Sequence, residues 1–402
     1  MREVIHLLVF LIFRSCPPTG EWVHAMQHQA LFAELGVVPR LRGSHRPRIG
    51  IIGAGRIAQQ RQIPAYRHAG LTVAAAADIR PEALERARRD YGIERLYGDY
   101  RELLEQRDIE IVDICTNTFP RKQITLDALS AGKHVLSEKP FARTLADARE
   151  LVRAAARSGV HLAVHQPTRW YYPCAVTREL VVRGLLGEIF YIEIRMHGNQ
   201  DTAYFNDPVT RWHADLTDHL FVEWGAHHFD LARWFAGGEE PSSVFAWGTA
   251  KGNEHFKSKM ALSATLRFDS GTCASLSLNQ ASRFITLPMT GMTFRVEGTL
   301  GTVAGNVLDS LSFASRARGG MEASFDWSAP LPREEDPHNY LWNASTRDGH
   351  LWPMVELINA IEEERPALCS GEDNILTVRT YLAALHSDRE YRPVRLDELD
   401  TM

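Results

Sequence analysis

The chain has 402 residues, of which 45% are hydrophobic and 24% are charged, and its formal net charge is −5. This length and composition are typical of a soluble protein with two domains, and the lack of a sustained basic block argues against nucleic-acid binding. The five cysteines are scattered without a C-x-x-C pair, which favours reduced thiols in a cytoplasmic protein over a disulfide framework.

Residues 1–47 differ in character from the rest and are expected to be a poorly structured N-terminal extension. The apolar run from Val4 to Phe13 is ten residues long, too short to span a bilayer. It also lacks the basic start and the small-residue cleavage site of an export signal. We therefore expect no association with a membrane.

Residues 48–165 are predicted to form a dinucleotide-binding Rossmann domain, which begins with a strand over 49–52. The glycine-rich turn Gly53-Ala54-Gly55-Arg56-Ile57-Ala58 follows this strand and leads into a helix. Gly53 permits the tight turn, and Gly55 lets the backbone approach a pyrophosphate. Arg56 and Ile57 open the helix, whose free N–H groups attract phosphate. A tight turn without a ligand is the alternative, because a lone glycine pattern often occurs by chance.

Asp78 closes the next predicted strand, over 71–77, and lies 25 residues after Gly53. A carboxylate at this place accepts hydrogen bonds from the ribose hydroxyls of the cofactor and repels a 2′-phosphate. The prediction is therefore an NAD cofactor. NADP is the alternative, because Arg80 can partly offset the repulsion.

Further strands are predicted over 109–115, 134–137 and 160–164, and helices over 81–91 and 123–131. Alternating strands and helices imply right-handed crossovers and a parallel sheet. Ligands of such sheets bind at the carboxyl ends of the strands. The candidate cofactor-binding residues at those ends are Gly53, Asp78, Thr116, Asn117, Glu138 and Lys139.

Three segments carry a likeness to a known family: the glycine-rich turn, the run from Ala128 to Pro140, and the run from Glu223 to Asp230. In order and spacing they resemble the Gfo/Idh/MocA family, which includes glucose-fructose oxidoreductase and inositol dehydrogenase. The resemblance covers most of the chain from Arg48 onward. It implies a Rossmann domain, then a domain with a large, mostly antiparallel open sheet, a nicotinamide cofactor and commonly a sugar or polyol substrate.

By this resemblance Lys139, in Glu138-Lys139-Pro140, matches the family's catalytic-site lysine. Oxidation of an alcohol needs a base for the hydroxyl proton, and burial lowers the pKa of a lysine toward that use. Glu138 is expected to orient the lysine or the backbone. A lysine that pairs with Glu138 at the surface is the alternative, and the Lys139–Pro140 peptide is open between its cis and trans forms.

A helix predicted over 220–235 places Glu223, His227 and Asp230 at i, i+4 and i+7, on one face. By resemblance His227 matches the family's substrate-contacting histidine. Glu223 stands where the family usually has aspartate, and it is expected to pair with His227. A buried histidine without a function is the alternative. Glutamate and histidine four residues apart can also share a metal ion, but no third ligand has a recognisable spacing, so no metal is expected.

Other segments depart from the family's pattern. Thr116-Asn117 and Arg121 stand where the family commonly has Thr-Pro followed by a histidine, and residues 215–219 replace a glycine-rich stretch. Arg169 and Trp170 follow the expected domain junction and, with Asp230, are candidate substrate-binding residues. Core packing is an equal interpretation for Trp170.

Residues 166–402 are predicted to form an α+β domain for substrate binding and oligomerisation. One face of its broad sheet needs a cover, so a homodimer or homotetramer is expected. Strands are predicted over 189–196, 244–249, 260–268, 272–278 and 292–297, and closing helices over 350–364 and 373–386.

These observations favour an NAD(P)-dependent dehydrogenase that acts on a secondary hydroxyl of a sugar, polyol or related compound. Lys139 would move the proton, and His227, tuned by Glu223, would bind the hydroxyl. One alternative is a glycoside-cleaving enzyme that retains its NAD and oxidises the sugar only transiently. The other is a sugar-sensing regulator without turnover.

Overall fold

The structure is a computed structural model that describes residues 35–199, 205–282, 291–317, 320–335 and 343–401. The apolar run predicted near the start of the chain lies outside these residues. Within the described residues, no helix combines the length and the apolar character needed to cross a bilayer.

Six parallel strands form the first sheet, in the order β3-β2-β1-β4-β5-β6. The order reverses between β1 and β4, where ligands of such sheets bind. Alanine has a low strand propensity, yet the alanine run of β2 forms a strand. It does so because Ala75–Ala77 pair with Gly50–Ile52 of β1. The strands are β1 (Arg48–Ile52), β2 (Thr72–Ala77), β3 (Arg95–Tyr97), β4 (Ile111–Ile114), β5 (His134–Glu138) and β6 (Leu162–His165).

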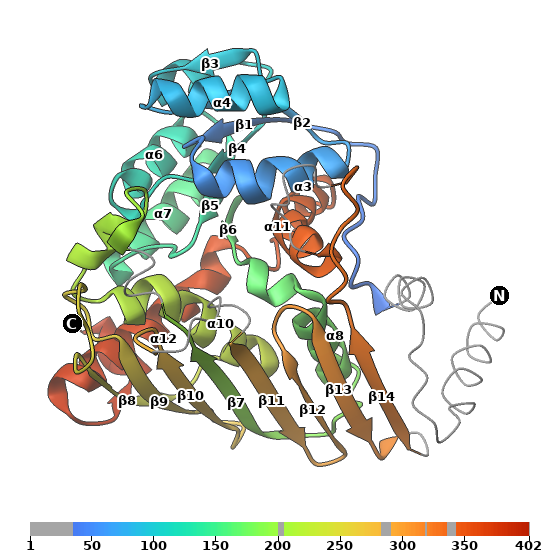
Figure 1. Cartoon of the computed structure of the whole chain (residues 1–402), viewed down its shortest axis with the longest axis vertical. Helices are drawn as coiled ribbons and strands as arrows, with labels where there is room; N and C mark the ends of the chain where they lie inside the picture. Colours follow the sequence, from blue (N-terminus) through green and yellow to red (C-terminus); the bar gives the residue numbers. More distant parts are fainter. Residues whose placement is uncertain (1–34, 200–204, 283–290, 318–319, 336–342, 402) are drawn as a thin grey trace.

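Helices cover both faces of this sheet, and one of them comes from the far end of the chain (Figure 1). That helix, α11 (Ala344–Glu362), shares a hydrophobic core with β1 through Met354, Val355 and Ile358. The predicted boundary at residue 165 thus separates the two sheets but not the packing around them. The other helices of this half are α3 (Ile63–His68), α4 (Pro81–Tyr91), α5 (Tyr100–Leu104), α6 (Thr118–Ser130) and α7 (Leu145–Ser158).

Residues 35–47 lie along α11, so the prediction of a poorly structured extension is wrong for this part of it. Val37 is buried, and its carbonyl accepts a hydrogen bond from Trp352 Nε1 at 2.9 Å. The Asn359 side chain bonds the backbone N–H of Arg42 at 3.0 Å and the carbonyl of Arg40 at 2.9 Å. Backbone groups satisfied by a helix side chain fix this segment in place.

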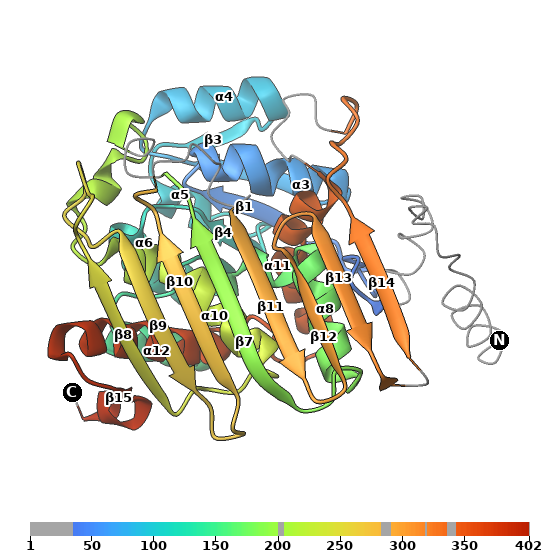
Figure 2. The same cartoon turned by 60° about the horizontal axis from the view of Figure 1, so that its bottom comes forward.

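The second sheet has nine strands in the order β14-β13-β12-β11-β7-β10-β9-β8-β15 and is antiparallel except for the β7–β10 pair. Figure 2 shows α8 (Tyr172–Val182), α10 (Gly225–Phe235) and α12 (Gly371–Glu390) on one face and no described helix on the other. The strands are β7 (Ile189–His197), β8 (Ser243–Thr249), β9 (Ala261–Arg267), β10 (Cys273–Asn279), β11 (Met292–Gly298), β12 (Gly301–Asn306), β13 (Ser310–Ser315), β14 (Met321–Asp326) and β15 (Val394–Arg395).

The burial of β9 follows the two-residue period of a strand. Leu262, Ala264 and Leu266 are buried toward the helices, while Ser263 and Thr265 are exposed on the open face. The two sheet orders confirm the predicted architecture, a Rossmann domain followed by an α+β domain with a large, mostly antiparallel open sheet.

Candidate active site

The glycine-rich turn forms a backbone cradle at the β1/β4 switch point. Gly53 has a φ of +92°, and a Cβ on it would lie 2.8 Å from the backbone nitrogen of Thr116, so a side chain is excluded there. A Cβ on Gly55 would meet only the guanidinium end of Arg80, at 3.0 Å. The surface over Gly55 is therefore open enough for a phosphate to approach the backbone.

Asp78 lies at the end of β2, beside this cradle. Its side chain is 5% exposed, and its Oδ1 accepts hydrogen bonds from the backbone N–H and Nε of Arg80 at 2.9 and 3.1 Å. Arg80 NH2 bonds the second carboxylate oxygen at 3.2 Å. Arg80, which was predicted to offset the negative charge of Asp78, thus holds in place the carboxylate that was predicted to bind the ribose.

The end of β4 adds polar groups on the other side of the switch point. Thr116 Oγ1 is buried without a hydrogen-bond partner among the described residues, and Asn117 is an exposed N-cap residue of α6 whose side chain caps no N–H. An unpartnered hydroxyl beside a glycine cradle fits a polar ligand such as the ribose-phosphate portion of NAD.

Two contacts join this edge of the first sheet to the segment 205–215 of the second half, coloured yellow-green in Figure 1. Arg56, in the glycine-rich turn, forms an ion pair with Asp207. The ring of Phe119, at the start of α6, lies edge-on to Trp212, with centroids 6.0 Å apart. Ile57, next to Arg56, remains 40% exposed.

Lys139 lies immediately after β5 and reaches into the second half of the molecule. Its Nζ donates a hydrogen bond to the backbone carbonyl of Glu223 at 2.9 Å and lies 5.8 Å from the centre of the Trp224 ring. Burial lowers the pKa of Lys139 from its ordinary value, against the opposing effect of the carboxylates of Glu223 and Glu138. The Lys139–Pro140 peptide is cis.

Glu138 holds the backbone at the lysine. Its carboxylate is buried and accepts hydrogen bonds from Gln62 Nε2 at 2.6 Å and from the backbone N–H of Lys139 at 3.2 Å. His165 Nδ1, at the end of β6, lies 3.3 Å from the same carboxylate. These partners fix the end of β5 from three directions.

The helix predicted over 220–235 is not regular. Residues Leu220–Trp224 form a π-helical turn that continues into α10. The Glu223 carboxylate accepts hydrogen bonds from Thr118 Oγ1 at 2.7 Å and Arg143 NH1 at 3.4 Å. The expected pair between Glu223 and His227 is not among the described contacts.

His227 is 8% exposed, and its Nδ1 lies 3.5 Å from Thr168 Oγ1. Burial holds the pKa of His227 well below its ordinary value, and the nearby Lys139 cation adds to this effect. The imidazole is therefore neutral at neutral pH and can both donate and accept a hydrogen bond. His228 is fully buried with Nδ1 2.7 Å from the Trp224 carbonyl, as expected for a packed residue.

Arg169 and Asp230 bond each other. Arg169 Nε and NH2 donate to the two Asp230 oxygens at 2.6 and 2.5 Å, and both residues are at most 1% exposed. The same NH2 reaches Asp373 of α12 at 2.5 Å, and Thr377 Oγ1 donates to Asp230 at 2.7 Å. Trp170 is buried between two other tryptophans of the core. These three predicted substrate contacts lie in a buried network that joins the domain junction to α10 and α12.

Sequence reasoning did not assign a role to Arg121, Arg143 or Asp218. Arg143 NH2 bonds both oxygens of Asp218, at 2.5 and 2.6 Å, beside the Glu223 carboxylate. The only signal was that Arg121 and the segment 215–219 depart from the family's pattern. Contacts across 75 or more residues, as between Arg143 and Asp218, have no local sequence signature.

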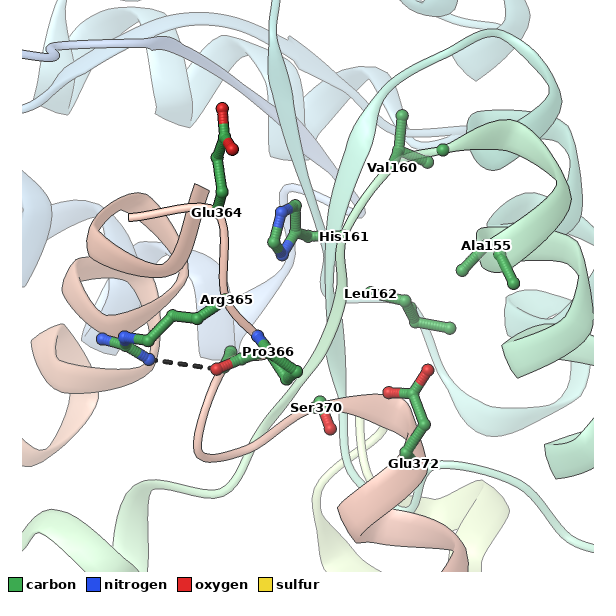
Figure 3. A pocket seen from close by; sticks show the side chains of 12 residues that line it. Ala155, Val160, His161, Leu162, Glu364, Arg365, Pro366, Ser370 and Glu372 are labelled. Carbon is green, nitrogen blue, oxygen red and sulfur yellow. Dashed lines mark hydrogen bonds between the residues drawn. The ribbon is translucent and has the colours of Figure 1, made fainter. Parts of the chain in front are cut away.

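A hollow of about 370 Å³ lies at the opposite edge of the first sheet. Figure 3 shows its lining, in which His161 precedes β6 and Glu364, Arg365 and Glu372 come from the loop between α11 and α12 and the start of α12. His161 marks the amino end of β6, whereas Lys139 follows the carboxyl end of β5. This hollow is therefore separate from the candidate active site. Among the described residues no three histidine, cysteine, aspartate or glutamate side chains are grouped to hold a metal ion.

A parallel sheet with a glycine cradle at its switch point and a second, mostly antiparallel sheet against it define a two-domain, dinucleotide-binding oxidoreductase. One family model, "Oxidoreductase family, NAD-binding Rossmann fold", matches residues 47–166, and a second, "GFO/IDH/MocA C-terminal domain", matches residues 175–304. The chain belongs to the Gfo/Idh/MocA family of NAD-dependent oxidoreductases.

Relatives and solved structures agree with this assignment. Myo-inositol 2-dehydrogenase of Thermotoga maritima is 25% identical over 88% of this chain and 99% of its own length. D-apiose dehydrogenase of Paraburkholderia graminis is 26% identical over 92% of this chain and 94% of its own length. The crystal structure of an oxidoreductase from Agrobacterium radiobacter in complex with NAD⁺, L-tartaric acid and magnesium has the same fold, with a TM-score of 0.76 at 22% identity over 88% of this chain and all of that one.

Proposed function

We propose that this protein transfers a hydride between a secondary hydroxyl of a sugar, polyol or related compound and NAD. The observation that carries the proposal is the position of Lys139. It is a half-buried amine, with a lowered pKa, at the carboxyl edge of the NAD-binding sheet, and it reaches to the start of the helix that carries His227. An amine in this environment can accept the proton that leaves an alcohol as hydride departs.

The residues that would hold the cofactor are those of the cradle. Gly53 and Gly55 would admit the pyrophosphate to the backbone, Asp78 would accept the ribose hydroxyls, and Thr116 would offer its unpartnered Oγ1. When bound, the nicotinamide supplies the hydride acceptor. Arg56, paired with Asp207, would lie over the phosphates at the mouth of the turn.

In this proposal Lys139 and His227 both contact the reacting hydroxyl, each with a different role. Neutral Lys139 accepts the hydroxyl proton, and neutral His227 donates a hydrogen bond that orients the same oxygen. Glu223 acts on this pair through its backbone carbonyl, which accepts the bond from Lys139 Nζ, and not through a bond between its carboxylate and His227.

The substrate class is supported by the relatives and by the polar groups at the site. Glu223, Arg143 and Asp218 form a carboxylate–guanidinium–carboxylate set, and ionised groups of this kind make strong hydrogen bonds to hydroxyls. Relatives at about a quarter identity act on a cyclic polyol and a pentose by their names. We therefore assign the substrate to the sugars and polyols.

One observation favours a second candidate, a glycoside-cleaving enzyme that retains its NAD. The Arg56–Asp207 ion pair and the Phe119–Trp212 contact both join the cofactor edge to segment 205–215. Such contacts would slow the departure of a bound dinucleotide. Cofactor that copurifies with the protein and the absence of net NADH formation on glycosides would favour this candidate over the dehydrogenase.

The test of the main proposal is a substrate screen. Sugars, polyols and inositols are mixed with the protein and NAD or NADP, and the absorbance of the reduced cofactor is followed. We expect NADH formation with at least one member of the panel. A panel without any reduction, with NAD binding demonstrated separately by fluorescence, would overturn the proposal.

We also propose that the open face of the second sheet pairs with a second copy of this chain, as a dimer or tetramer. The support is that no described helix covers this face, while the opposite face is covered by three (Figure 2). Light scattering should give a mass of at least two chains. A monomer at micromolar concentration would contradict the assignment.

A further inference from the structure

Arg121, on the first turn of α6, bonds backbone groups on both sides of Lys139. Its NH1 donates to the backbone carbonyls of Glu138 and Pro140, both at 2.9 Å, and these carbonyls flank Lys139 in the chain. Its NH2 donates to the carbonyl of Thr116 at the end of β4. One guanidinium thus ties the ends of β4 and β5 together on both sides of the lysine.

The positive charge of Arg121 is not cancelled by direct contact with a carboxylate. The side chain is 6% exposed, its Nε has no hydrogen-bond partner, and no ion pair to it is found among the described residues. Three carbonyl dipoles satisfy its other nitrogens. A buried cation near a second cation disfavours the charged form of the second, and Arg121 accordingly contributes to the lowered pKa of Lys139 after burial itself.

We propose that Arg121 is a positioning residue for the proton transfer: its planar fork fixes the backbone on both sides of Lys139, and its charge, which no bonded carboxylate offsets, opposes protonation of the lysine amine. This inference rests on the proposed role of Lys139 as proton acceptor. Arginine suits the position because it stays charged when buried and because its fork reaches two backbone segments at once. A histidine, which commonly stands at this point in the family, has neither property.

Other charged groups near Lys139 also affect the pKa of its amine. Two carboxylates, Glu223 and Glu138, favour the protonated amine. Burial lowers the pKa values of the neighbouring histidines, and a charge on Lys139 would add to this effect, so these histidines are neutral at neutral pH. These histidines are His213 before the π-helical turn, His219 at its start, and His227 and His228 on α10.

The composition of the chain makes the proposal directly testable, because it contains only six lysines, at 122, 133, 139, 251, 257 and 259. Reductive methylation with ¹³C-formaldehyde labels each amine, and NMR then follows the titration of each dimethyl-lysine. The Lys139 signal is assigned by its loss in Lys139→Arg. This readout needs no substrate, so its failure is distinguishable from a failure of the proposed function.

Two substitutions separate charge from position. Arg121→Gln keeps N–H donors and removes the charge, and we expect the Lys139 titration to move to higher pH. Arg121→Lys keeps the charge and removes the fork. Its Lys139 titration should stay near that of the wild type, while kcat on a substrate found by the screen falls at least ~10-fold.

Lys122→Met is the matched control, since Lys122 is the next cation on the same helix but lies at the surface beside Asp147 and Glu150. It should leave the Lys139 titration unchanged. An unchanged Lys139 titration in folded, NAD-binding Arg121→Gln protein would overturn the charge role. If Arg121→Gln does not fold, the kcat of Arg121→Lys is the test. A normal kcat in that variant would overturn the positioning role.

Discussion

The buried ion pair between Arg169 and Asp230 gives a prediction that separates a structural role from a substrate-binding role. Arg169→Met keeps the length of the side chain and removes the guanidinium. Asp230, which is 0% exposed, then keeps only the hydroxyl of Thr377 at 2.7 Å and the guanidinium of Arg233 at 3.9 Å. Removal of one partner of a buried ion pair costs about 3–5 kcal/mol of folding free energy.

That cost is a large share of the about 5–15 kcal/mol that stabilises a typical protein. The apparent unfolding temperature should fall by about 4–6 °C, measured by circular dichroism. The double variant Arg169→Met/Asp230→Leu replaces the ion pair by apolar groups of similar volume and should recover at least half of the loss. If Arg169→Met unfolds at the same temperature as the wild type but has a raised KM, this reasoning is refuted and Arg169 is a substrate-binding residue.

Three further predictions address the cofactor, the substrate and the pH. Asp78→Ser should weaken NAD more than NADP, because it removes the ribose acceptor and frees the Arg80 guanidinium for a 2′-phosphate; an unchanged ratio of dissociation constants would place ribose binding elsewhere. His227→Ala should impair kcat/KM for the substrate and spare NAD affinity, whereas intact kinetics would reduce it to packing. Burial lowers the pKa of His228 to about 4, so the stability that the neutral imidazole contributes is present above pH about 6.5 and is lost as the pH falls toward 4. Burial raises the pKa of Asp113 to about 6, and this shift has the opposite effect on stability between pH 6 and 4. The pKa values of His219, His227 and His350 shift in the same direction as that of His228. The urea midpoint should therefore be lower at pH 5 than at pH 7, and an equal or higher midpoint at pH 5 would show that the histidines do not dominate.

The sequence predicted most of the strands, because each depends on a short, local pattern. The helix over 81–91 and the predicted strands agree with the structure to within two residues at their ends, whereas β3 and β12 to β15 were not predicted. The helix expected at 123 begins at Thr118 instead, with Asn117 as its N-cap residue. The family resemblance, and not periodicity, predicted that the second sheet would be mostly antiparallel and open.

The candidate site was predicted less completely, because its chemistry depends on contacts that are distant in sequence. The π-helical turn at 220–224 has no local signature, and neither has the hydrogen bond of the Glu223 carboxylate to Thr118, which is 105 residues away in the chain. Arg169 and Asp230 were assigned to the substrate because of their place near the junction and on the helix. Their mutual bond could be seen only once the domain junction and α10 were brought together in space.

The central claim is that Lys139 takes the proton from a sugar or polyol hydroxyl while NAD takes the hydride. Its most direct test is the rate of NADH formation by the wild type and by Lys139→Met with the same substrate at saturating NAD. We predict a fall in kcat of at least ~10²-fold with NAD affinity preserved. Comparable turnover in both proteins would contradict the account.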